Sequence, residues 1–128
     1  MKYHLDTSVL IDWERDEPTL AKLRLEIAGG LHDVTIDAIV ETEFLASRQL
    51  GPVQRLTFES ITRISRRAPI TRRASELAAS WLAPMDRAQR RARFADAIIA
   101  AVSHLAGATL LTTDSGIAST FPVRVQAY

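Results

Sequence analysis

The sequence contains no cysteine, and this absence excludes several kinds of chemistry. Without thiols there can be no disulfide framework, no zinc–thiolate site and no cysteine nucleophile, and a reducing compartment is the natural setting. Long apolar runs are also missing. The longest, around residues 97–102, is far shorter than a membrane span, and the first ten residues lack the apolar core of a signal peptide. We therefore expect a cytoplasmic protein with no membrane partner.

The net charge of +1 conceals an uneven distribution of charge along the chain. Residues 48–93 hold eleven arginines and only three acidic residues, a local balance of +8, while the remainder carries −7. Arginines can bind phosphates and carboxylates can hold divalent metal, so this asymmetry suits an anionic substrate. Arg-rich helices are more often solvated faces or partner surfaces, and both interpretations stay open.

The length of 128 residues predicts a single domain, residues 1–128, with no linker or repeat. Short runs rich in β-branched or aromatic residues predict strands at 2–6, 33–36, 108–113 and 123–128, with room for a brief strand at 68–70. Helical patterns cover 8–15, 19–28, 38–49, 53–65, 71–82 and 86–106. This alternation predicts an α/β domain around a parallel sheet that is covered on both faces.

Two of the predicted strands end in an acidic residue. Asp6 closes KYHLD just before a helix, and Asp114 closes ATLLTTD just before a Ser-Gly turn. In open α/β sheets, ligands bind beyond the carboxyl ends of the strands, so acids at these positions are candidate ligands. Aspartate is also a favoured helix cap and turn residue, and either acid taken alone is more typical of a cap.

Two further acids lie on predicted helices. Glu43 borders the apolar side of the helix in IDAIVETEFLAS, whereas Glu41 points roughly the opposite way. Asp96 opens the apolar stretch that continues as AIIAAVSHLAG, where a carboxylate must be capped, paired or bound to metal.

Four carboxylates that approach one cleft can hold one or two Mg²⁺ or Mn²⁺ ions, which prefer oxygen ligands. Such ions can support metal-assisted hydrolysis of a phosphodiester. The hydroxyls of Thr7, Ser8, Thr112 and Thr113 can hydrogen-bond a carboxylate or a metal-bound water. For Ser8 and Thr113, capping a helix and filling a strand position are at least equally good explanations.

At these residues the sequence resembles the PIN-domain ribonucleases, and within them the VapC toxins of toxin–antitoxin (VapBC) pairs. YHLDTSVLID resembles the segment with the family's first acid, and IDAIVETEFLAS the segment with the second. FADAIIAAVSHLAGATLLTTD resembles the segment with the third acid and the Thr-x-Asp ending. Two departures are small: Asp37 stands where Ser is common, and Ser115 follows the last acid.

The resemblance implies a PIN-like three-layer α/β/α fold with four to five parallel strands and an endoribonuclease that depends on Mg²⁺ or Mn²⁺. Its implied catalytic residues are Asp6, Glu43, Asp96 and Asp114. Among them Asp6, Asp96 and Asp114 are the expected metal ligands, with Thr7 and Thr112 in support. An RNA substrate, a cognate antitoxin and a homodimer are also implied.

The arginines just before the third acid, Arg90, Arg91 and Arg93, are candidate RNA contacts because they concentrate positive charge there.

Other functions compete with this interpretation. A haloacid-dehalogenase-like phosphatase needs a second aspartate two residues after the first, where this chain has Ser8. A receiver-like domain normally employs a lysine near the end of its last strand, and the only lysines here are Lys2 and Lys22. A catalytically inactive PIN-like module that binds a partner is the non-enzymatic alternative, although all four acids are present.

Overall fold

The computed structural model describes residues 1–47 and 50–128 as an α/β fold with a five-stranded sheet. The strands are β1 (Lys2–Leu5), β2 (Asp33–Ile36), β3 (Arg66–Arg67), β4 (Thr109–Leu111) and β5 (Val125–Gln126). Their spatial order is β3-β2-β1-β4-β5, and every adjacent pair is parallel. The first strand is therefore central, with Tyr3 opposite Val34 on one side and Thr109 on the other.

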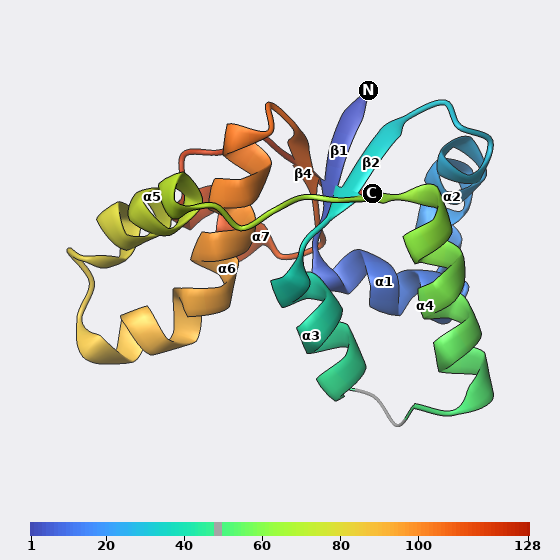
Figure 1. Cartoon of the computed structure of the whole chain (residues 1–128), viewed down its shortest axis with the longest axis horizontal. Helices are drawn as coiled ribbons and strands as arrows, with labels where there is room; N and C mark the ends of the chain where they lie inside the picture. Colours follow the sequence, from blue (N-terminus) through green and yellow to red (C-terminus); the bar gives the residue numbers. More distant parts are fainter. Residues whose placement is uncertain (48–49) are drawn as a thin grey trace.

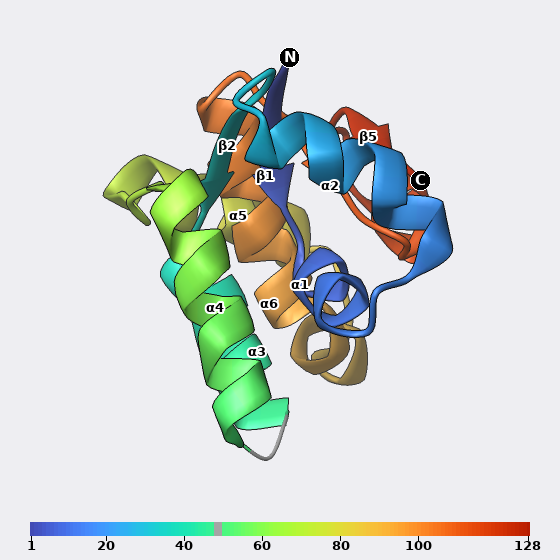
Figure 2. The same ribbon diagram turned by 90° about the vertical axis from the view of Figure 1, so that its right-hand side faces the viewer.

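Helices cover both faces of this sheet. They are α1 (Thr7–Glu14), α2 (Ala21–Ala28), α3 (Ala38–Ser47), α4 (Pro52–Ile64), α5 (Arg72–Leu82), α6 (Arg87–Leu105) and α7 (Ser115–Thr120), with a 3₁₀ turn at Pro18–Leu20. Helices α5 and α6 lie on one side of the strands and α1, α2 and α4 on the other (Figure 1). The turned view has α1, α2 and α4 in front of the sheet (Figure 2). The predicted three-layer α/β/α architecture with a parallel sheet is confirmed.

The core lies between the sheet and α6 on one face and between the sheet and α1 on the other. The last three residues of β1 and of β2 are buried, as expected for strands covered on both faces. Helix α6 is buried along its second half, where Ala97, Ile99, Ala100, Ala101 and Val102 are at most 3% exposed. Its first half is mostly exposed, so this helix connects the core with the surface.

The strand expected at residues 68–70 lies two residues earlier, at Arg66–Arg67. The amide of Ala68 still donates to the carbonyl of Ile36 (2.7 Å), but Pro69 has no amide hydrogen and cannot continue the ladder. The last strand is likewise confined to Val125–Gln126. The Ser-Gly turn expected after Asp114 is instead the start of α7. Of the helix expected at 38–49, residues 48–49 lie outside the described residues.

The carboxyl ends of β1, β2 and β4 meet at one edge of the sheet. Helix α1 begins directly after β1, α3 after β2, and α7 after β4. Helix α3 packs against both α1 and α6, so it brings its own side chains to the same edge (Figure 1). Within the described residues, none of the helices is both long and apolar enough to cross a membrane.

Candidate functional site

Asp6 lies where the central strand passes into α1. It occupies the N-cap position of α1 but makes no side-chain cap hydrogen bond. Its Oδ2 instead accepts hydrogen bonds from the hydroxyls of Thr112 (2.6 Å) and Ser8 (3.3 Å). The carboxylate is only 6% exposed. Helix capping therefore does not explain this acid.

Asp114 ends the segment that follows β4 and serves as the N-cap of α7. Its Oδ1 accepts from the amide of Gly116 at 2.8 Å, which leaves Oδ2 for another partner. Its own amide donates to the hydroxyl of Thr112 at 3.0 Å. Thr112 thus links this acid to Asp6, and the two strand-end acids belong to one hydrogen-bond network.

Glu43 approaches the same edge from α3. Its Oε1 accepts a hydrogen bond from the hydroxyl of Thr7 (2.7 Å). Burial raises the pKa of Glu43, and the nearby charges of Asp6, Asp96 and Asp37 raise it further, while the bond from Thr7 opposes this. This carboxyl is therefore easier to protonate than an exposed glutamate.

Asp96 approaches from the middle of α6 and does not cap that helix. The N-cap is Asp86, ten residues earlier, which forms a capping box with Gln89. The cap alternative for Asp96 is therefore wrong. Burial raises its pKa, a hydrogen bond from Arg93 opposes this, and the charges of Asp6 and Asp114 add to the increase. Mutual repulsion is evidence that the four acids form one electrostatic group.

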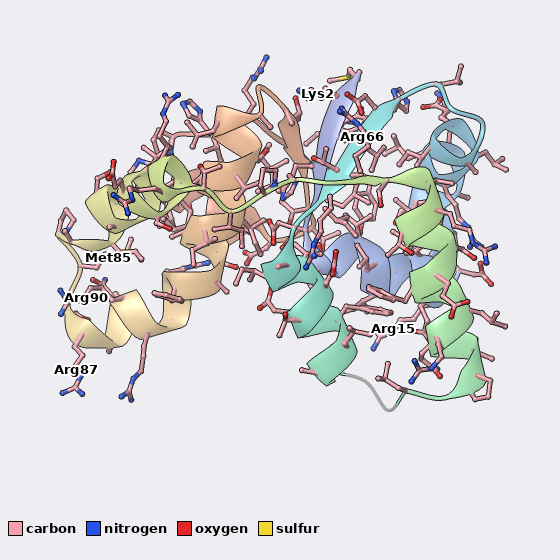
Figure 3. All side chains as sticks on the ribbon, in the orientation of Figure 1. Lys2, Arg15, Arg66, Met85, Arg87 and Arg90 are labelled. Atoms are coloured by element: carbon pink, nitrogen blue, oxygen red, sulfur yellow. The ribbon has the colours of Figure 1, made fainter. Side chains whose placement is uncertain are left out.

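The three arginines expected to contact RNA do not share one environment. Arg93 is turned toward the acids, with its Nη1 3.1 Å from Oδ2 of Asp96 and 3.7 Å from Oδ2 of Asp114. Arg90 and Arg91 are exposed at the beginning of α6, where Arg90 and Arg87 extend away from the ribbon (Figure 3). The structure therefore separates Arg93, which contacts two acids, from the exposed Arg90 and Arg91.

The chemistry of the four acids suits a hard divalent cation. Carboxylate and hydroxyl oxygens are the ligands that Mg²⁺ and Mn²⁺ prefer, and the repulsion among the acids would be relieved by positive charge. Among residues 1–47 and 50–128, however, no group of three or more acidic or histidine side chains is close enough together to hold a metal ion. A cation would have to draw the carboxylates together, and Arg93 lies between two of them.

Sequence reasoning missed a buried pair beside this site. His4 Nε2 lies 2.7 Å from Oδ2 of Asp37, and both residues are fully buried. The other oxygen of Asp37 accepts from the amides of Ile39 and Val40, which begin α3. Asp37, at the position where Ser is common, thus caps the helix that carries Glu43.

Tyr128 is a second residue that the sequence analysis did not single out. Its hydroxyl donates to Oδ2 of Asp12 at 2.5 Å, which ties the C-terminal segment to α1. Burial raises the pKa of Tyr128, the bond to Asp12 raises it further, and a hydrogen bond from Ser8 lowers it. Because Ser8 also contacts Asp6, Tyr128 borders the site.

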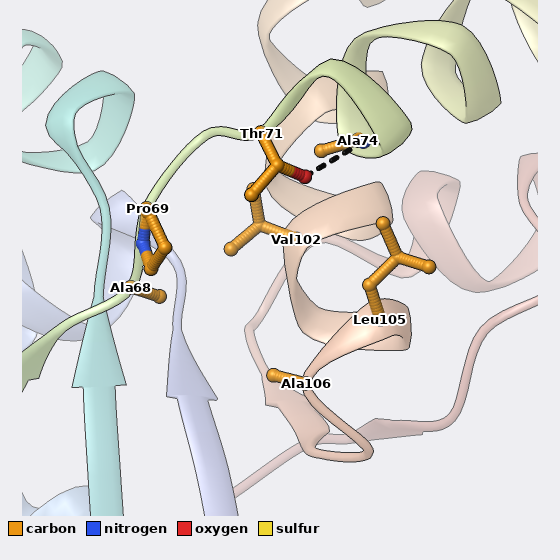
Figure 4. Close-up of a pocket in the computed structure, with 7 residues that line it drawn as sticks. All are labelled: Ala68, Pro69, Thr71, Ala74, Val102, Leu105 and Ala106. Atoms are coloured by element: carbon orange, nitrogen blue, oxygen red, sulfur yellow. Dashed lines mark hydrogen bonds between the residues drawn. The ribbon is translucent and has the colours of Figure 1, made fainter.

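An apolar hollow of about 150 Å³ has none of the acids in its lining (Figure 4). It is lined by Ala68, Pro69, Thr71, Ala74, Val102, Leu105 and Ala106. The one side-chain hydroxyl in this lining, that of Thr71, accepts from the amide of Ala74 at the start of α5. The hollow offers no acid, base or nucleophile, and the candidate site remains the carboxylate group.

Comparisons with known proteins show the family and the fold of the chain. A family model described as PIN domain matches residues 3–120. A comparison with curated proteins finds no match.

Several solved structures share the fold at low sequence identity. The VapBC2 structure from Rickettsia felis, bound to a promoter DNA fragment, matches with a TM-score of 0.75 and 14% identity over 99% of this chain and 98% of that chain. DNA-bound VapBC from Salmonella typhimurium matches with a TM-score of 0.70 and 15% identity over the same shares. FitAcB from Neisseria gonorrhoeae matches with a TM-score of 0.66 and 24% identity over 96% and 95%.

Proposed function

Because the chain belongs to the PIN domain family, we propose that it is a metal-dependent endoribonuclease whose site is formed by Asp6, Glu43, Asp96 and Asp114. The observation that carries this proposal is the convergence of these acids from four separate segments at the carboxyl edge of the sheet. Their electrostatic coupling, expressed in the raised pKa of Glu43 and of Asp96, supports it. A role in stability alone would not require mutually repelling acids.

In the proposed reaction, Asp6, Asp96 and Asp114 would hold Mg²⁺ or Mn²⁺, while a water molecule attacks the phosphorus and the P–O bond to the departing strand breaks. When bound, the cation lowers the pKa of a water molecule and offsets negative charge on the phosphodiester. Thr112 and Ser8 hold the Asp6 carboxylate in one orientation through their hydroxyls. Glu43 is the acid best suited to accept the proton that the attacking water loses, because its pKa is raised and Thr7 occupies only one of its oxygens.

The decisive experiment measures cleavage of single-stranded and structured RNA with Mg²⁺ or Mn²⁺ and with EDTA. Asp96→Asn should lower cleavage by about a hundredfold or more, because it removes a hard ligand while keeping the side-chain shape. Asp86→Asn is the matched control, since it removes the same charge from the same helix and Asn caps about as well as Asp.

Equal activity of the two variants, or cleavage that persists in EDTA, would contradict the proposal. Hydrolysis of a small phosphomonoester without any cleavage of RNA would favour the haloacid-dehalogenase-like alternative. Metal binding without hydrolysis of either substrate would favour an inactive partner-binding module.

We also infer that the chain is the toxin of a toxin–antitoxin pair, with a cognate antitoxin and a homodimeric assembly. This inference is supported by the fold shared with VapBC and FitAcB and by the resemblance to VapC toxins. Co-expression with a candidate cognate antitoxin should suppress RNA cleavage and yield a co-purifying complex. Light scattering on the isolated chain tests the dimer, and a monomeric mass across the accessible concentrations would contradict it.

A further inference from the structure

We propose that Arg93 is a built-in counter-ion, which bridges Asp96 and Asp114 in the metal-free protein and which an incoming divalent cation must displace. This inference rests on the proposed function, because it assumes that these acids bind the metal. It adds a residue of opposite charge to a site otherwise described by its acids. It also assigns Arg93 a role different from direct contact with RNA.

The first support is the position of the guanidinium. Its Nη1 lies 3.1 Å from Oδ2 of Asp96 and 3.7 Å from Oδ2 of Asp114, so one positive group serves two carboxylates from different elements. The side chain is 31% exposed, less than the other arginines of the first turns of α6, which are exposed. A cation shared between Asp96 and Asp114 would need the same space.

The second support is the shape of the surface beneath the guanidinium. A Cβ added to Gly116 would lie 2.5 Å from Nη2 and 3.0 Å from Nη1 of Arg93. Any larger residue at position 116 would therefore push the guanidinium away. Two features therefore place the guanidinium between the acids. Arg93 lies three residues before Asp96 on the same helix, and Gly116 in a distant segment leaves room for it.

The third support is the spacing of the acids. The four carboxylates come to the carboxyl edge of the sheet from different elements, yet within the described residues no three acidic or histidine side chains form a ready metal site. Positive charge from Arg93 already offsets part of the repulsion between Asp96 and Asp114, because its Nη1 lies 3.1 Å from Oδ2 of Asp96 and 3.7 Å from Oδ2 of Asp114. Metal and arginine are therefore alternative ways to neutralise the same pair.

The experiment compares Mn²⁺ binding by calorimetry in the RNA-free wild-type chain, in Arg93→Gln and in Arg90→Gln. If Arg93 must be displaced, Arg93→Gln should bind Mn²⁺ about fivefold more tightly than wild type, the fold-change that corresponds to a partly exposed ion pair. Arg90→Gln removes the same charge one turn earlier and should stay close to wild type. In EDTA, Arg93→Gln should melt below Arg90→Gln, because Asp96 and Asp114 lose their shared partner.

A second measurement uses the wild-type chain alone and therefore does not depend on whether a variant folds. The Nε–H resonance of Arg93 in the wild-type chain should shift when Mg²⁺ is added, and its exchange with water should accelerate. An unchanged resonance at saturating Mg²⁺ would overturn the displacement model.

Equal or weaker Mn²⁺ binding by Arg93→Gln, with wild type binding well, would overturn this inference and leave the proposed function standing. Failure of every variant and of wild type to bind Mn²⁺ would overturn both.

Discussion

The hydroxyl of Thr112 donates a 2.6 Å hydrogen bond to Oδ2 of Asp6, and it joins residues that are 106 positions apart in the chain. The same hydroxyl accepts from the amide of Asp114. The Thr112 side chain, just after β4, therefore orients both the carboxylate of Asp6 and the backbone of Asp114. Thr112 is 1% exposed, so no solvent can replace either bond without rearrangement.

Thr112→Val should show that this hydroxyl positions the site. The substitution keeps the β-branched shape but leaves a buried carboxylate oxygen and an amide with fewer partners, which should cost about 2 kcal/mol of unfolding free energy. Cleavage should fall about tenfold, because the orientation of Asp6 becomes less defined. Denaturant unfolding and RNA cleavage measure the two effects. Thr112→Ser is the control that retains the hydroxyl, and equal cleavage by the two variants would contradict this role.

Glu43→Gln should change how stability depends on pH in EDTA. A carboxyl whose pKa is higher in the folded than in the unfolded protein stabilises the fold below its unfolded pKa, and this contribution is lost as pH rises through the folded pKa. Burial places Glu43 in this class, above its ordinary value of 4.5. The melting temperature of wild type should therefore fall relative to that of Glu43→Gln as pH rises from acid to neutral, by about 2 °C.

Glu59→Gln, at an exposed position on α4, is the control for this measurement. It removes the same charge from outside the site and should follow the wild-type pH dependence. Glu43→Gln should also lose about a hundredfold in cleavage if the carboxyl accepts a proton. Parallel stability profiles for wild type and Glu43→Gln would contradict the assigned electrostatic environment.

Asp37→Ala should test the buried pair that anchors α3. The variant removes the partner of His4 and two hydrogen bonds to the first amides of the helix, so we expect a loss of about 3 kcal/mol. Asp37→Asn retains an oxygen acceptor for these amides and should lose less than half as much. Chemical denaturation distinguishes the two variants. Equal losses would show that the charge, and not the cap, is what the helix needs.

The location of the strand-end acids could be predicted because it depends on general rules of α/β folds. Asp6 and Asp114 follow strands, and parallel strands present their carboxyl ends at one edge. The spacing of Arg93 and Asp96 also permits a helical pair, so part of the counter-ion arrangement was accessible from the sequence. The contact of Arg93 with Asp114 was not, because it depends on how α6 and α7 pack.

Other features had no local signal. Tyr128 and Asp12 are 116 residues apart, and a C-terminal tyrosine gives no indication of its partner. The pair formed by His4 and Asp37 depends on the register of two neighbouring strands, which places Thr35 opposite His4. A sequence pattern predicts that these strands exist, but not which polar side chains face each other across them. The role of Asp37 as a cap could have been inferred from its place just before α3.

Arg90→Gln combined with Arg91→Gln should test whether the exposed start of α6 binds the RNA backbone. These arginines line an open hollow of about 540 Å³ with Arg87 and the 58% exposed ring of Phe94. If each contacts one phosphate of a single strand, the double variant should lower the slope of log affinity against log salt by about 1.4, because fewer counterions are released. Cleavage at saturating RNA should change little, since both side chains lie outside the carboxylate group.

Arg72→Gln combined with Arg73→Gln, at the exposed start of α5, is the matched control with the same loss of charge. A fall in slope of equal size in both double variants would show that RNA responds to overall charge, and an unchanged slope in the α6 variant would assign that surface to a protein partner or to solvent.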